Sequence, residues 1–219
     1  MFIRNSFFAF LYRIFSLLFI ISGILRHLSF SDISHNRHMF SFFTIQSNLL
    51  CMILFIFLCF DSYREMSLKS IYPYRFNNVL LRGICLSSIT VTFLIFQFVL
   101  KRSYFSMCSG VNGTVSTNDL FVHYLTPLFT VSDWILFEPK GQISFRHPLY
   151  WLILPVCYFT ATMIRGYIIA GPYPYFFMDI SSVGAGRFIF YSAILISFYT
   201  IIAYIIALAD KILLHISIR

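Results

Sequence analysis

Six long apolar runs constrain this chain more than any other feature of its sequence. Each run is close to the roughly 20 residues that a helix needs to cross a bilayer, whereas a transmembrane strand needs about 10 alternating residues. The sequence therefore predicts an all-α polytopic membrane protein, a bundle of six transmembrane helices. The predicted spans are about Phe7 to Leu25, Phe40 to Phe60, Gly83 to Leu100, Leu120 to Phe137, Pro148 to Ile164 and Phe188 to Ala209.

The composition agrees with lipid as the solvent of this chain. Hydrophobic residues make up 59% and charged residues 11% of the sequence, so the charges are too few to cover a water-facing surface. Six spans and short loops use up all 219 residues, and we expect a single domain, residues 1–219. No small-residue cleavage site follows the first run, so we expect it to remain as a helix and not to be removed as a signal peptide.

The net charge of +8 is distributed in short segments between the apolar runs and forms no basic stripe. We therefore predict membrane lipids as partners and no nucleic acid. Nine Lys and Arg residues flank the side that carries both termini and six flank the other side, with Arg13 left out as intramembrane. The positive-inside rule then places both termini in the cytoplasm. Richness in Phe, Ile, Tyr and Ser is compatible with a bacterium of low GC content, and hence with its inner (plasma) membrane.

The sequence predicts no metal site and no cofactor. The five cysteines include no CxxC pair, which argues against redox chemistry and a structural zinc. His27, His35 and His38 cluster near the first loop, but their spacing matches no known metal site.

Polar residues recur at helical spacing inside three of the runs. Polar groups within a membrane are costly, so these faces are expected to point into the bundle and to line one cavity. The seams are Ser41, Thr44, Ser47, Asn48 and Cys51 in the second run, Ser87, Thr90 and Gln97 in the third, and His123, Thr126, Pro127, Thr130 and Asp133 in the fourth.

Thr44 and His123 lie at matching depths within these seams. At 1.5 Å per residue, each is about 5 to 6 Å below the same boundary of the membrane. A hydroxyl beside an imidazole is the minimum for nucleophilic catalysis, because the alcohol is inert until a base removes its proton. A simpler interpretation stays open: Thr44 would bond a carbonyl of its own helix, and His123 would bond across the bundle.

Three motifs resemble the androgen-induced protein superfamily of six-helix membrane proteins, and more closely its prokaryotic relatives, the Pr6Pr membrane proteins. They are Phe43-Thr44-Ile45-Gln46-Ser47-Asn48, His123-Tyr124-Leu125-Thr126-Pro127, and Gly171-Pro172-Tyr173-Pro174-Tyr175-Phe176 followed by Gly184-Ala185-Gly186-Arg187. Animal members of that family look like threonine hydrolases that cleave fatty acid esters of hydroxy fatty acids. The resemblance implies that Thr44 is the nucleophile, that His123 is the base and that the substrate is a lipid ester.

Further residues are assigned on this hypothesis. Ser47 and Asn48 share the face of Thr44 and are candidates to stabilise an oxyanion. Asp179 is the candidate to orient His123, and Arg165 or Arg187 would bind a substrate carboxylate. The alternative is a non-catalytic membrane protein, either a small-solute carrier or a lipid-binding helper whose polar seams only hold helices together.

Arg13 and Asp133 are charged residues deep within apolar runs. They lie about 18 Å and 20 Å below the same boundary. Because a lone charge at that depth is costly, we predict a structural salt bridge between them.

Overall fold

The computed structural model describes residues 2–3, 5–68, 78–101, 116–169 and 172–218, and these residues form helices and no strand. Six of the helical segments are long and apolar enough to cross a membrane. The protein is therefore an integral membrane protein with a bundle of six transmembrane helices, which confirms the predicted fold class. The six are α1 (Ser6–His27), α3 (Phe43–Leu68), α4 (Val79–Ile95) with η1 (Phe96–Leu100), α6 (Thr117–Leu120) with η2 (Phe121–Leu125) and α7 (Thr126–Phe137), α8 (His147–Trp151) with α9 (Ile153–Ile169), and α11 (Ala185–Ile218).

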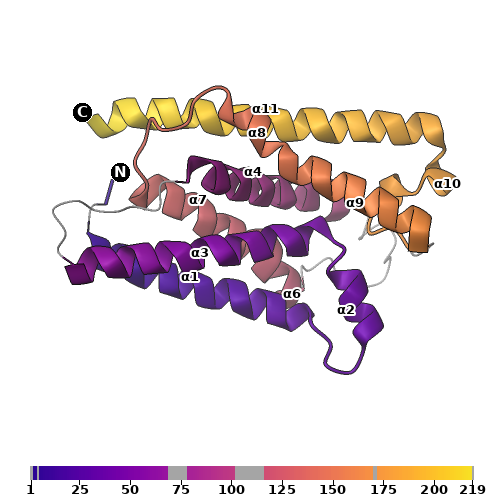
Figure 1. Ribbon diagram of the computed structural model, residues 1–219, viewed down its shortest axis with the longest axis horizontal. Coiled ribbons are helices and arrows are strands. Elements are labelled where there is room, and N and C mark those ends of the chain that lie inside the picture. Colours follow the sequence, from indigo (N-terminus) through magenta and orange to yellow (C-terminus); the bar gives the residue numbers. More distant parts are fainter. Residues whose placement is uncertain (1, 4, 69–77, 102–115, 170–171, 219) are drawn as a thin grey trace.

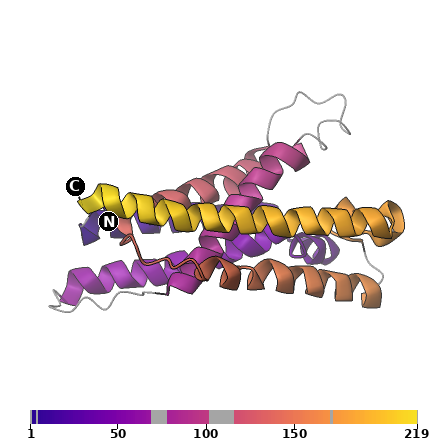
Figure 2. The same cartoon turned by 90° about the horizontal axis from the view of Figure 1, so that it is seen from above.

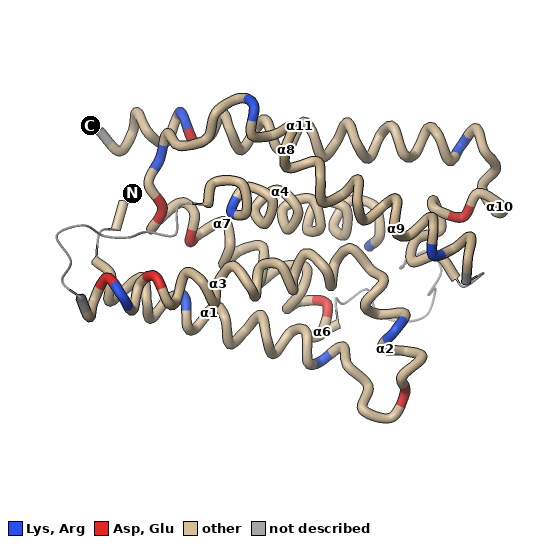
Figure 3. The backbone as a smooth tube through the Cα atoms, in the orientation of Figure 1, with Lys and Arg blue, Asp and Glu red and all other residues tan. Residues whose placement is uncertain are grey.

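Both chain termini lie at one end of the bundle, which we call the terminal end; the other is the opposite end (Figure 1). Short helices are found at the opposite end, where α2 (Ile33–Met39), η3 (Phe176–Met178) and α10 (Ile180–Val183) connect the long ones. Seen from above, α4 and α7 cross α11 at an angle (Figure 2). Lys, Arg, Asp and Glu lie mainly near the helix ends (Figure 3).

The helices extend beyond the predicted apolar runs. α3 continues to Leu68 and α11 to Ile218, because backbone hydrogen bonds propagate a helix after the residues become polar. The starts of α1 and α4 follow from capping: the side chain of Asn5 accepts a hydrogen bond from Phe7 N, and that of Asn78 accepts one from Leu81 N.

Two of the buried apolar clusters join the long helices. The first joins α1, α3 and α4 around Ile20, Phe55 and Ile89, and the second joins α4, α8 and α11 around Trp151 and Ala203.

The second core depends on a close approach of α4 to α8. A Cβ atom at Gly83 would overlap the indole of Trp151, so the glycine is what allows the two helices to meet there. Small residues serve this purpose in many membrane bundles.

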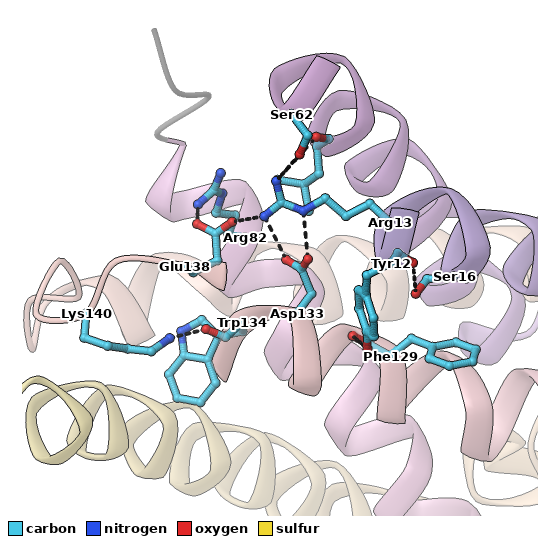
Figure 4. A network of polar contacts seen from close by, with 11 residues as sticks. Tyr12, Arg13, Ser16, Ser62, Arg82, Phe129, Asp133, Trp134, Glu138 and Lys140 are labelled. Carbon is cyan, nitrogen blue, oxygen red and sulfur yellow. Dashed lines mark hydrogen bonds and ion pairs between the residues drawn. The ribbon is translucent and has the colours of Figure 1, made fainter. Parts of the chain in front are cut away.

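The predicted salt bridge between Arg13 and Asp133 is present, with Nε and Oδ1 2.8 Å apart (Figure 4). The structure adds two partners that the sequence did not suggest. Nη2 of Arg13, which also bonds Asp133 Oδ2 at 3.4 Å, bonds Glu138 at 2.7 Å, and Glu138 in turn pairs with Arg82. Ser62 accepts a further hydrogen bond from Arg13 at 2.7 Å. These four charged residues, here called the charge cluster, compensate one another in the half of the bundle nearer the termini.

Some residues used in the sequence predictions lie outside the described part of the chain. They are Gly171 of the third motif and, among the flanking cations, Arg4, Lys69, Arg75, Arg102 and Arg219.

Candidate functional site

A cavity of about 160 Å³ lies toward the opposite end of the bundle. Its volume is several times the roughly 30 Å³ that one water molecule occupies in the liquid. It is partly open, and two of its wall residues, Val156 on α9 and Ile196 on α11, are themselves about half exposed on the lipid-facing surface. We call it the lateral cavity, because these two exposed wall residues lie on the sides of transmembrane helices.

The described residues that form the wall of the lateral cavity are apolar apart from their hydroxyl groups, and none of them is charged. Four segments supply the wall: the start of α3, the last turns of α4 with η1, α8 to α9 with η3, and α11. The hydroxyl groups belong to Thr44, Thr92, Tyr158, Tyr175, Ser192 and Tyr199. The prediction that the three polar seams line one cavity is wrong. Thr44 is the one seam residue among the described wall residues, α4 contributes other positions than its predicted seam, and α9 and α11 take the place of the fourth run.

Thr44 lies in the first turn of α3, where its side chain is buried and forms part of the cavity wall. The hydroxyl of Tyr175 lies next to it, close enough for a polar contact. Burial raises the pKa of Tyr175, although its contacts with Thr44 and Phe43 act in the opposite direction. The Tyr175 hydroxyl therefore keeps its proton at neutral pH and is a hydrogen-bond donor.

His123 lies in the π-helical turn η2, immediately before α7. Pro127, four residues later, has no backbone N–H to bond the His123 carbonyl. The Thr126 N–H bonds the Phe121 carbonyl across the wider turn. A π turn of this kind often occurs at functional sites.

The wider turn also changes where the imidazole points. Its ring stacks on Phe96, with centroids 3.8 Å apart and planes 10° from parallel, and it does not belong to the wall of the lateral cavity. The structure thus places Thr44, but not His123, in this cavity, because a π turn rotates residues away from the ideal α-helical face. Nδ1 of His123 is buried without a hydrogen-bond partner among the described residues.

Asn48 links the two elements that carry Thr44 and His123. Its side-chain amide donates to the Thr44 carbonyl at 2.8 Å and to the Val122 carbonyl at 3.1 Å. The Asn48 side chain therefore connects the backbone at Thr44 with the backbone next to His123.

The predicted oxyanion donors are already engaged. Asn48 uses its amide hydrogens on those two carbonyls, and Ser47 donates to the Thr44 carbonyl at 2.9 Å while contacting Thr92 Oγ1 at 3.0 Å. Since a serine hydroxyl has a single proton, neither residue has a donor left for an oxyanion. In this structure both hold α3 in position.

The three remaining candidate residues, Arg165, Arg187 and Asp179, are not wall residues of the lateral cavity. Arg165 donates to the Pro172 carbonyl at 2.9 Å, Arg187 is exposed, and neither belongs to the wall of the lateral cavity. Asp179 caps α10 by accepting a hydrogen bond from Ser181 N at 3.0 Å. The Ser181 hydrogen bonds also lower the pKa of Asp179, so its carboxylate stabilises this short helix and does not orient His123.

Sequence reasoning missed Tyr175 as a site residue, although it lies inside one of the three motifs. The periodicity of a span cannot assign a residue in a connection between spans. Among the described residues, no group of three His, Cys, Asp or Glu side chains is arranged to hold a metal ion.

Comparison with known proteins adds no assignment. The chain matches no protein-family model, no curated protein and no solved structure.

Proposed function

We propose that this protein takes a lipid ester from the bilayer into the lateral cavity and hydrolyses it, with Thr44 as nucleophile and His123 as general base. The observation that carries the proposal is the position of Thr44 in the wall of a mainly apolar, partly open cavity, two of whose wall residues are half exposed on transmembrane helices. The motif resemblance supports the same two residues, and we propose on that basis that the chain is a distant relative of the Pr6Pr membrane proteins.

The binding half of the proposal follows from the cavity wall. Apolar pockets with a few convergent polar groups are typical ligand sites. Because the surrounding solvent is lipid, a molecule with an acyl chain would enter between α9 and α11 without crossing water.

The chemical half needs the imidazole to reach Thr44 Oγ, directly or through one water. Thr44 Oγ would then bond the carbonyl carbon of the ester while His123 takes its proton. The alcohol would leave with that proton, and water would cleave the acyl-threonine to give a fatty acid and the free enzyme. The unpartnered Nδ1 supports this assignment, because a buried ring nitrogen without a hydrogen bond is unusual in a purely structural histidine.

Tyr175 replaces Ser47 and Asn48 as the proposed oxyanion donor. It lies in the cavity beside Thr44 and keeps its proton. Its hydroxyl would donate to the carbonyl oxygen as negative charge develops there.

The test is labelling of the purified protein with a fluorophosphonate probe for serine and threonine hydrolases. Wild type should be labelled, and Thr44→Ala should not. Thr92→Ala is the matched control, because Thr92 lies in the same cavity wall but its hydroxyl contacts Ser47. Labelling that persists in Thr44→Ala would exclude Thr44 as the nucleophile.

The second candidate is a lipid-binding protein without catalysis. One observation favours it: His123 stacks on Phe96 outside the cavity wall. Lipid binding with no labelling and no ester turnover in wild type would select this function. A small-solute carrier is less well supported, because the lateral cavity offers no charge to a polar solute.

We also propose that the terminal end faces the cytoplasm of a bacterium and that the lateral cavity lies in the outer leaflet. The excess of Lys and Arg on the terminal side supports this orientation. Labelling of single introduced cysteines from either side of the membrane would test it.

A further inference from the structure

The polar side chains that the described residues contribute to the wall of the lateral cavity are all neutral. We propose that the ligand is an uncharged lipid of the acylglycerol type, with its ester or hydroxyl group at Thr44 and Tyr175 and its acyl chain along α9 and α11. This inference rests on the proposed function of the same cavity and specifies its substrate class. It departs from the expectation that an arginine holds a free carboxylate.

The absence of charge among the described wall residues disfavours an ionised ligand on physical grounds. A carboxylate or phosphate that leaves water needs a cation or several donors to replace its hydration. The two arginines expected to supply this charge are not wall residues: the Arg165 guanidinium interacts electrostatically with Tyr158 of the wall but donates to the Pro172 carbonyl, and Arg187 is exposed. An ester or a hydroxyl group needs only one or two hydrogen bonds.

The hydrogen-bond partners of the wall hydroxyls show where a ligand's polar group belongs. Tyr158 donates to the Ser41 carbonyl at 3.0 Å, and Ser192 donates to the Phe188 carbonyl at 2.8 Å. Their protons are thus used within the protein.

Two further wall hydroxyls have protein partners of their own. Tyr199 contacts the hydroxyls of Ser87 and Ser88 at 2.7 and 2.9 Å, and Thr92 contacts Ser47. The Thr44 and Tyr175 side chains lie next to each other in the wall. This pair is the proposed polar anchor, while the remaining wall suits a hydrocarbon chain.

Three probes of one chain length separate neutral from ionised ligands. They are palmitate, its neutral isostere palmitamide, and 1-O-hexadecylglycerol, an ether that cannot be hydrolysed. Binding to the purified full-length protein in neutral detergent at pH 8 is measured by native mass spectrometry. We expect the two neutral probes to bind at least tenfold more tightly than palmitate, which is ionised at this pH.

A pair of neighbouring positions on α11 locates the binding site. Leu195 belongs to the cavity wall, whereas Ile194 is 48% exposed and does not. Leu195→Phe should weaken binding of the neutral probes at least tenfold, and Ile194→Phe should leave it unchanged. Thermal unfolding of both variants establishes that they are folded.

The outcomes distinguish the failure of this inference from that of the proposed function. Palmitate binding as tightly as palmitamide would overturn the uncharged ligand and leave a lipid site in place. Equal binding to Leu195→Phe and wild type, or no binding of any probe, would remove the cavity as the site. Neutral binding at the cavity without hydrolysis of a monoacylglycerol would uphold this inference and refute the enzyme.

Discussion

The two halves of the bundle differ in the buried polar groups that they contain. In the charge cluster near the terminal end, Arg13 bonds both Asp133 and Glu138, and Glu138 also pairs with Arg82. Near the opposite end, Nδ1 of His123 and Oδ1 of Asn48 are buried without a partner among the described residues, beside a cavity that contains no charge in its wall.

This difference assigns stability mainly to the terminal end of the bundle and function to the opposite end. A compensated set of charges fixes the positions of α1, α4 and α7, and breaking it leaves an uncompensated charge in a low-dielectric interior. Unpartnered neutral groups beside a cavity hold the helices together less strongly, but they remain available to a ligand. We therefore expect substitutions near the terminal end to lower stability, and substitutions at the opposite end to lower activity.

The largest expected effect follows from removing one charge of the cluster. Asp133→Leu leaves Arg13 and Arg82 with Glu138 as their only carboxylate partner in the cluster and should lower the free energy of unfolding by about 3–5 kcal/mol. The double variant Arg13→Met/Asp133→Leu keeps the Arg82 and Glu138 pair and should recover most of the loss. Unfolding in detergent measures both, and a double variant as unstable as the single one would contradict compensation as the reason for the cluster.

A smaller effect is expected where α4 meets α8. Gly83→Ala forces a methyl group into the Trp151 indole and should destabilise the protein by about 1–3 kcal/mol. Gly186→Ala is the matched control, because nothing lies within 4 Å of a Cβ atom at that position. Equal stability of the two variants would show that Trp151 moves aside without loss of packing.

The pH dependence of stability should reveal the lowered pKa of Lys140, a residue in the connection between α7 and α8. Burial lowers its pKa from 10.5 to about 8, so the folded protein binds this proton less tightly than the unfolded chain does. Stability should therefore rise between pH 8 and pH 10, by about 1 kcal/mol after solvent screening is taken into account. Lys140→Met should have a flatter profile than wild type over this range, whereas identical profiles would rule out the shift.

The smallest effect on stability is expected at His123. Its Nδ1 has no hydrogen-bond partner among the described residues, so His123→Gln should change the free energy of unfolding by less than about 1 kcal/mol. On the proposed mechanism the same variant should lose ester hydrolysis, typically by 10²–10⁴-fold. Loss of folding together with activity would instead indicate that the imidazole has a structural role in the bundle.

Much of the fold could be predicted because membrane solvation acts on individual residues. A span needs enough apolar residues in a row, whatever its neighbours are, and all six predicted runs correspond to long apolar helices. The pairing of Arg13 with Asp133 was predictable for a similar reason, since two charges at equal depth lower each other's cost. Glu138 and Arg82 were missed because they lie at helix ends, where depth alone does not distinguish a paired charge from a solvated one.

The candidate site was predicted less well, because it depends on the direction in which each side chain leaves its helix and not only on its depth in the membrane. Thr44 does lie in a cavity wall, yet the π turn beside Pro127 rotates the imidazole of His123 onto Phe96. The hydroxyl next to Thr44 belongs to Tyr175, more than a hundred residues away in a connection with no periodic pattern.

By itself, the sequence determined the helical class, the number of spans and the depth of each polar residue, because these follow from the transfer of single residues between water and lipid. Only the tertiary structure decided which helices enclose the lateral cavity, which donors around Thr44 are already engaged, and that the cavity wall carries no charge. Those properties arise from the rotation and tilt of packed helices, which are set by contacts between residues distant in the chain.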